Sequence, residues 1–85
     1  MQASVIIINP SRGMVAAKSA DSDDIVIFEL LGEYEVQLGD VISHPDFTSM
    51  GGETYRNVTQ QQDMSVYVQN VVWTIEAAKK QCFLK

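Results

Sequence analysis

The sequence predicts a mainly β protein, a small antiparallel barrel of five or six strands followed by one short C-terminal α-helix. Three observations carry this prediction. Apolar and polar residues alternate along several short runs, which is the period of a half-buried strand. Turn-forming residues separate these runs at intervals of roughly eight to twelve residues, as they do in small barrels. Only the segment 74–84 shows helical spacing.

The chain of 85 residues has room for one domain, which we expect to span residues 1–85. A domain of this size buries only about 60 to 65% of the surface of its unfolded chain, so a second core is not expected. Apolar residues make up 46% of the sequence, enough to fold without disulfides or metal ions. The net charge of -5 repels phosphate backbones and disfavours nonspecific binding of nucleic acids.

Two further patterns bear on the cellular compartment. Cys82 is the single cysteine and cannot form an intramolecular disulfide, and the N-terminus lacks the pattern of a secretory signal. We therefore expect a cytoplasmic protein. The apolar runs are much shorter than the roughly 20 residues that span a bilayer, so we expect no membrane segment.

The first half of the chain predicts three strands. Val5–Ile8 is a continuous β-branched run, typical of a strand covered on both faces. The turn residues of 9–13 separate it from an antiparallel strand at Met14–Lys18. The acidic reversal 20–24 then leads into Ile25–Leu31, the segment with the strongest β propensity.

The alternation assigns faces to the central strands. Val26, Phe28 and Leu30 share one parity and are expected in the core, with Glu29 on a partly wet face. After Gly32, alternation continues through 33–38, which predicts another half-buried strand. Its inward residues would be Tyr34, Val36 and Leu38.

The second half predicts shorter and less regular strands. Val41–Ile42 resumes the extended chain, and the mixed parity of 53–59 allows a bulge or a strong twist. A polar turn at 60–63 precedes a strand with regular alternation. Its inward residues are Met64, Val66 and Val68, and its outward residues are Ser65, Tyr67 and Gln69.

The C-terminal segment predicts a short helix over about residues 74–84. Ile75, Ala78 and Cys82 fall at helical spacing, and an acidic first turn with later lysines complements the helix dipole. We expect the helix to pack against the sheet because an isolated helix of this length is marginal in water. The expected contacts are Trp73, Ile75 and Phe83, with Cys82 as a small buried hydrophobe.

Four strings, GMVAAK, IVIFELLG, VQLGDVIS and SVYVQNV, give the chain a rhythm of strands and glycine turns over residues 13–71. This rhythm resembles the OB-fold, S1 and cold-shock group of small barrels. The resemblance implies an OB-like barrel, but the interleaved lysines and phenylalanines of cold-shock proteins are missing. The overall pattern is that of a small bacterial protein.

The loop 39–53 contains the only histidine and permits two interpretations. His44, with Asp40, Asp46 and Glu53 nearby, has the residue types of a metal site or an acid–base pair. A structural zinc site normally takes four Cys or His ligands, and the chain offers only Cys82 and His44. We therefore favour a surface corner, and we expect no bound metal ion and no cofactor.

Other catalytic patterns are weak or absent. The run Asp21–Asp24 resembles a calcium loop but lacks the glycine and the later glutamate at their required positions, so we interpret it as a solvated hairpin turn. No nucleophile is set beside a base, and the pair Gly51–Gly52 lacks the context of a phosphate loop. A small enzyme that uses His44 stays open, but the prediction is a protein without catalytic activity.

One group of residues is a candidate binding surface, made of aromatic side chains and nearby cations. Exposed aromatic residues on a barrel face can grip a peptide or stack on bases. In the alternative interpretation, which we favour, Tyr67 lies under the C-terminal helix and Tyr55 under its cross-strand neighbour. The candidate residues are Tyr55, Arg56, Tyr67, Phe47, Arg12 and Lys18.

These patterns predict a non-enzymatic module that binds another protein or associates with itself. The acidic charge and the scarcity of basic residues favour this class. The alternative is binding of single-stranded nucleic acid on an OB-like barrel face, through Arg12, Lys18, Arg56 and Tyr67. The sequence leaves the identity of the partner open.

Overall fold

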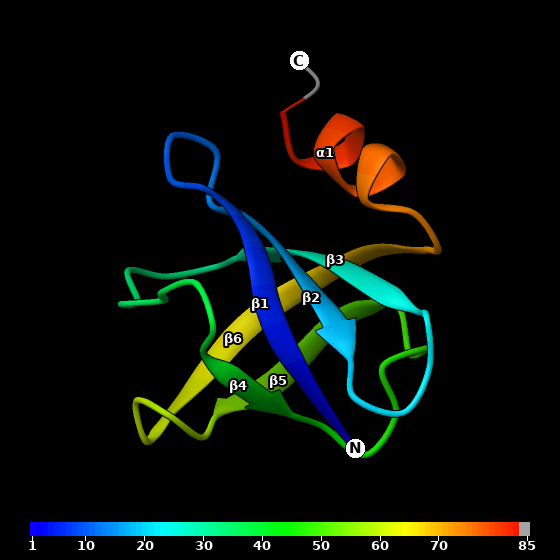
Figure 1. Ribbon diagram of the computed structural model, residues 1–85. Coiled ribbons are helices and arrows are strands. Elements are labelled where there is room, and N and C mark those ends of the chain that lie inside the picture. The colour runs from blue at the N-terminus through cyan, green and yellow to red at the C-terminus, as the bar shows by residue number, and fades with distance from the viewer. Residues whose placement is uncertain (84–85) are drawn as a thin grey trace.

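The computed structural model describes residues 1–83, which form six strands and one helix (Figure 1). The predicted helix end at residue 84 lies outside the described residues. The strands are β1 (Gln2–Asn9), β2 (Met14–Ser19), β3 (Ile25–Leu30), β4 (Val41–Ser43), β5 (Gly51–Asn57) and β6 (Gln62–Val72), followed by α1 (Ile75–Phe83).

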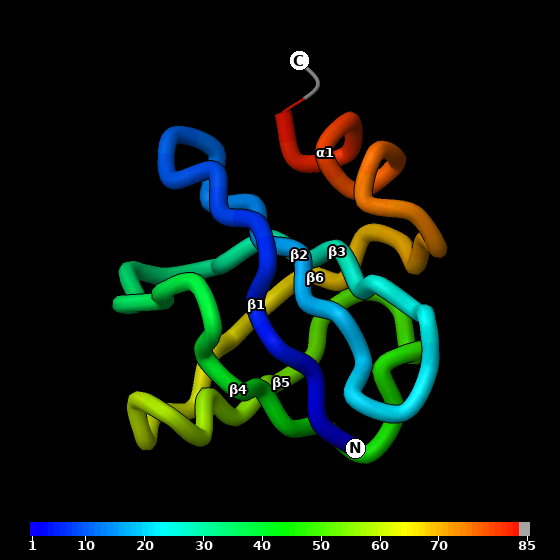
Figure 2. Tube along the Cα trace, viewed as in Figure 1, coloured from blue at the N-terminus to red at the C-terminus, as the bar shows by residue number. Residues whose placement is uncertain are grey.

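The six strands close into an antiparallel barrel in the order β1-β2-β3-β6-β5-β4, with β4 returning to pair with β1 (Figure 2). β1, β2 and β3 form a meander, and β4 lies on the other side of β1, which is the Greek-key arrangement. The predicted fold class, a mainly β barrel with one short C-terminal helix, is confirmed. Closure leaves few unpaired sheet edges, which suits a chain with few basic residues to guard them.

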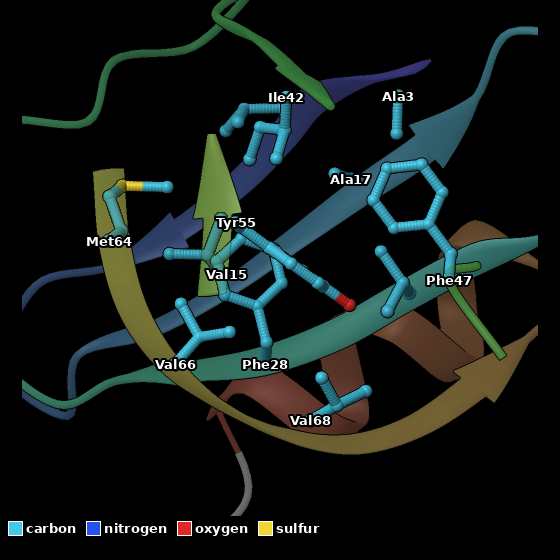
Figure 3. Close-up of a cluster of buried hydrophobic side chains, with 12 residues drawn as sticks. Ala3, Val15, Ala17, Phe28, Ile42, Phe47, Tyr55, Met64, Val66 and Val68 are labelled. Carbon is cyan, nitrogen blue, oxygen red and sulfur yellow. The ribbon is translucent and has the colours of Figure 1, made fainter. Parts of the chain in front are cut away.

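The barrel interior is the main hydrophobic core (Figure 3). Tyr55 lies at its centre, with edge-to-face contacts to Phe28 at 4.9 Å and to Phe47 at 5.3 Å between ring centroids. Phe28 and Val66, which the alternation placed in the core, are fully buried. The other buried members are Ala3, Val5, Val15, Ala17, Val26, Ile42, Met64 and Val68.

A second core lies between α1 and the outer face of β1, β2 and β3. Ala78 and Cys82 are buried in it, so the prediction of Cys82 as a buried hydrophobe is confirmed. The expected contacts through Trp73, Ile75 and Phe83 are wrong, because all three side chains are more than half exposed. Small residues face the sheet because they let the short helix approach it closely.

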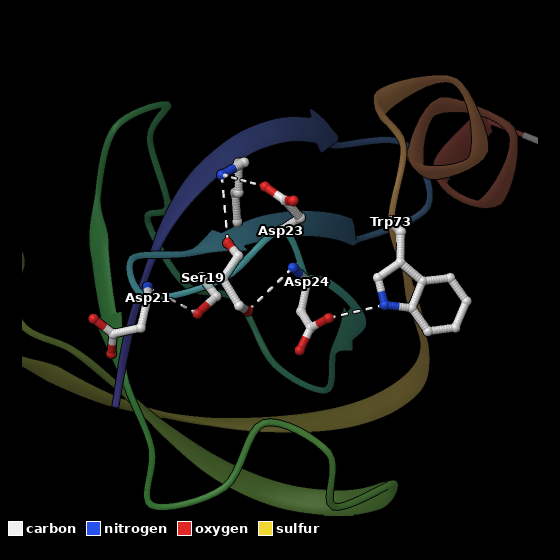
Figure 4. A network of polar contacts seen from close by, with 7 residues as sticks. Ser19, Asp21, Asp23, Asp24 and Trp73 are labelled. Atoms are coloured by element: carbon white, nitrogen blue, oxygen red, sulfur yellow. Dashed lines mark hydrogen bonds and ion pairs between the residues drawn. The ribbon is translucent and has the colours of Figure 1, made fainter.

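Polar contacts fix the two ends of this helical segment. At its C-terminal end the Asn9 side-chain amide donates to the Cys82 carbonyl at 2.9 Å. At its N-terminal end the Thr74 hydroxyl accepts from the Ala77 amide at 3.1 Å, as a helix cap does. Trp73 Nε1 donates to Asp24 at 2.9 Å (Figure 4), so this tryptophan is held at the surface rather than buried.

The acidic reversal between β2 and β3 is a hairpin turn held by its own side chains (Figure 4). The Asp21 amide donates to Ser19 Oγ at 3.3 Å and the Asp24 amide to Ser22 Oγ at 3.2 Å. Lys18 lies 4.0 Å from the Asp23 carboxylate. The two amide to hydroxyl bonds are local side chain to backbone bonds of the kind that stabilise turns.

The predicted strand 33–38 is wrong, although part of its alternation is real. Tyr34 and Val36 are half-buried against the main core, as the pattern indicated, but Leu38 is 68% exposed. The segment is not paired with any strand. Alternation reports that one side of a segment is covered, and it does not report whether a neighbouring strand is available for hydrogen bonding.

Two smaller expectations also shift. β5 begins two residues earlier than the predicted 53–59 and pairs with β6 in unbroken register. The irregularities allowed there lie instead in β1, between Val5 and Ile7, and in β6, where Gln69 is the extra residue opposite the step from Ile27 to Phe28. The turn predicted at 60–63 lies two residues earlier, at 58–61, because β5 ends at Asn57 and β6 starts at Gln62. Within residues 1–83, no helix has the length and apolar character needed to cross a membrane.

Candidate functional site

Two of the candidate surface residues lie inside the barrel. The Tyr55 side chain is 0% exposed and Phe47 is 5% exposed, so neither can stack on a base or contact a partner. The interpretation that Tyr55 is a core residue is confirmed, with Met64 as its cross-strand partner. Phe47 follows the proline of the loop and inserts its ring into the barrel, a position that a loop residue does not reveal in sequence.

Tyr67 and Arg56 remain on the surface. Tyr67 is 47% exposed on the outer face of β6, opposite Gly52, and the expectation that the helix covers it is wrong because α1 packs on β1, β2 and β3. Arg56 lies on the same outer face of β5 and contacts the Asp63 carboxylate at 3.3 Å. The outer face of β5 and β6 therefore carries one aromatic residue and, four residues away in the strand register, one already paired cation.

Arg12 and Lys18 lie elsewhere. Arg12 is exposed in the turn between β1 and β2, and Lys18 is on β2, near Asp23. β3 and β6 separate β2 from β5 in the barrel. The four residues proposed for nucleic-acid binding thus do not form one continuous surface.

His44 is held in a polar and aromatic corner after β4. Its Nδ1 accepts from the Asp46 amide at 2.9 Å, which places the ring proton on Nε2, and Nε2 donates to Glu53 at 2.7 Å. The ring packs against Tyr55 and Phe47 at 5.0 and 6.0 Å between centroids. Nδ1 therefore stabilises the loop 44–50 internally, and Nε2 ties this loop to β5.

The protonation states of Asp46 and Tyr55 in this corner suit a structural role. Hydrogen bonds from the Thr48 hydroxyl and amide lower the pKa of Asp46, which accordingly stays ionised and fixes the loop. Burial raises the pKa of Tyr55, whose hydroxyl stays neutral. In the described part of the chain, no three His, Cys, Asp or Glu residues gather in a way that could hold a metal ion.

A groove lies between the end of β1 and the segment that joins β3 to β4. Its volume is about 530 Å³. Ile8, Leu30, Tyr34 and Val36 form an apolar floor that continues the main core. The remaining lining residues are Pro10, Gly13, Gly32, Glu33 and Glu35.

The wall of this groove is fixed by contacts to β6. The Ser65 amide donates to the Tyr34 hydroxyl at 3.1 Å, and Gln62 Nε2 donates to the Glu35 carbonyl at 2.9 Å. Tyr34 packs over Gly32, where a Cβ atom would meet the ring at 3.1 Å. A side chain at position 32 would therefore require the Tyr34 ring to shift by a few tenths of an ångström.

The opposite wall is the outer edge of β1. Val5 uses this edge, since its amide donates to the Asp40 carbonyl at 2.9 Å and its carbonyl accepts from the Gly39 amide at 2.8 Å. The bulge between Val5 and Ile7 changes the parity, so that Ile8 is the next residue facing the interior. The amide and carbonyl of Ile8 therefore point to the same edge of β1 as those of Val5. Among residues 1–83, no backbone hydrogen bond joins Ile8 to the segment 33–38.

The groove also has an acidic rim. Glu33 and Glu35 are exposed and alternate with the half-buried Tyr34 and Val36. Within the described chain neither glutamate takes part in an ion pair. The rim therefore presents two carboxylates to solvent beside an apolar floor.

Sequence reasoning missed this groove, although one signal was available. The alternation of 33–38 is bounded by Gly32 and Gly39, so the segment is a short extended piece that glycines separate from its neighbours. The opposite wall of the groove comes from Ile8 on β1, and only the bulge in β1 turns Ile8 toward the segment. The position of that bulge is not visible in the run Val5–Ile8.

Comparisons with protein-family models, with curated proteins and with solved structures gave no match for this chain.

Proposed function

We propose that this chain is a non-enzymatic binding domain that holds a segment of another protein in the groove between β1 and residues 33–38. The observation that carries the proposal is the groove itself, with an apolar floor of Ile8, Leu30 and Val36 open to solvent. Concave sites of a few hundred Å³ with apolar floors and a few polar groups are the usual form of binding sites.

The position of the helix favours a protein over a nucleic acid as the partner. A closed barrel in Greek-key order is compatible with an OB-like barrel, and OB folds bind oligonucleotides on the face of strands 2 and 3. Here α1 covers β2 and β3, with Ala16, Ile25 and Ile27 buried beneath it. The acidic rim and the net charge of -5 also repel phosphate groups.

A selection from a displayed library of random decapeptides tests the proposal. We expect enriched peptides to bind the wild-type protein and the variant Tyr67→Ala with equal affinity. They should bind Tyr34→Ala at least about tenfold more weakly, because truncation removes one wall of the groove. Tyr34 is half-buried and Tyr67 is exposed, but the two substitutions remove the same side chain and so are matched in size and chemistry.

Two outcomes would overturn the proposal. Equal retention of the peptides by Tyr34→Ala would place binding elsewhere. Alternatively, amide shifts at Arg56 and Tyr67 on titration with oligothymidylate at low salt, with no enriched peptide, would favour the nucleic-acid alternative. Self-association would appear instead as a dimer in light scattering across a concentration series.

A further inference from the structure

We propose that the occupant of the groove is an extended segment of a partner protein with alternating apolar and basic residues, which adds to the barrel as a strand along the β1 edge at Ile8. This inference rests on the proposed function and specifies the conformation and the charge of the partner. Two features of the groove carry it: the backbone on its β1 wall and the charge on its rim.

The backbone of the β1 wall favours an extended partner. β1 continues beyond its pairing with β4, which ends at the pair Ser4 and Val41, while Val5 still bonds to Gly39 and Asp40. Past that point the edge at Ile8 has no backbone partner in the described chain. An added strand supplies hydrogen bonds to such an edge, which is a common mode of peptide recognition.

The side chains of the groove set the pattern of the partner. Successive residues of a strand point to opposite sides, so alternate side chains of the added segment would meet the floor of Ile8, Leu30 and Val36. The residues between them would lie toward the rim, where Glu33 and Glu35 have no basic partner among the described residues. Lysine or arginine at those positions gives complementary charge.

Charge reversal of the rim tests the inference on the peptides selected above. We expect Glu33→Lys combined with Glu35→Lys to weaken binding of the enriched peptide by at least about tenfold, because attraction becomes repulsion. The matched control is Asp21→Lys combined with Asp23→Lys in the exposed turn between β2 and β3, which changes the net charge equally. The control should change the affinity by less than about threefold. All four positions are exposed, so folding is retained.

Amide exchange supplies a second measurement that reports on the backbone. In the complex we expect the Ile8 amide to exchange much more slowly than in the free protein, and methylation of the facing peptide nitrogen to abolish binding.

Unchanged exchange at Ile8, together with peptide-induced chemical-shift changes at Tyr34 and Val36, would overturn strand addition and leave the proposed function intact. Enriched peptides without basic residues would overturn the proposed basic pattern of the partner. An equal loss of peptide affinity in the rim variant and in the control variant would overturn it too. Absence of any peptide binding at the groove would overturn both proposals, and a dimer lost on rim reversal would make a second copy the occupant.

Discussion

Tyr55 combines an aromatic ring at the centre of the core with a hydroxyl that lies among apolar side chains (Figure 3). Within residues 1–83 its oxygen has no hydrogen-bond partner. A buried polar group without a partner costs about 1–3 kcal/mol of desolvation. The ring itself contributes contacts with Phe28, Phe47 and His44. The ring alone therefore accounts for the stabilising contribution of Tyr55 to the fold.

Replacing Tyr55 by phenylalanine should raise the free energy of unfolding at pH 7 by about 1 kcal/mol, since the ring stays and the unpaired hydroxyl is removed. Urea denaturation monitored by Trp73 fluorescence measures the change. Tyr67→Phe, on the exposed outer face, is the control and should leave stability unchanged. A loss of stability in Tyr55→Phe comparable to a core truncation would show that the hydroxyl has a partner that stabilises the fold.

The same hydroxyl predicts how stability depends on alkaline pH. Burial raises the pKa of Tyr55 in the folded state, so above the unfolded value of about 10 the folded chain keeps a proton that the unfolded chain loses. Stability is then fully present below pH 10 and falls above it, by at most about 1.4 kcal/mol per pH unit. The difference between wild type and Tyr55→Phe between pH 8 and pH 11 isolates this contribution. A constant difference over that range would contradict it.

Among the elements, α1 owes its place to two small buried residues and one bond from Asn9. The sequence predicted the helix from its spacing, but the large apolar residues around it indicated the wrong contacts. Spacing identifies a face, and the identity of the buried residues depends on how close the helix lies to the sheet. Exposed Trp73 and buried Ala78 are both consequences of that close approach.

Ala78→Glu should loosen the helix, because a carboxylate cannot be buried against Ile25 and Ile27 without a partner. Burial of Cys82 slows its reaction with thiol reagents and raises its pKa, so the rate of modification of Cys82 by a disulfide reagent reports on the helix. We expect that rate to rise by at least about tenfold. Gln81→Glu, which adds the same charge on the exposed side, should keep the wild-type rate. Equal rates in all three proteins would show that α1 is not what protects Cys82.

At the scale of the whole molecule, the sequence predicted the barrel and its single helix but not the order of the strands. The alternation in β3 and β6 and the turn residues before β2 and β3 were sufficient for the fold class. The order depends on which edges meet after the chain has curled, and no single segment carries that information. The groove could not be predicted for the same reason, because its walls come from residues about 25 positions apart along the chain.

The direct test of the account is amide hydrogen exchange of the protein alone, followed residue by residue by NMR. We expect the Val5 amide, bonded to Asp40, and the Phe28 amide in the barrel to be protected. The Ile8 amide should exchange rapidly, as should the amides of 33–36, which leaves the β1 edge available to a partner strand. Joint protection of Ile8 with Tyr34 or Val36 would mean that 33–38 pairs with β1 as a seventh strand, and the groove proposed as the binding site would not exist.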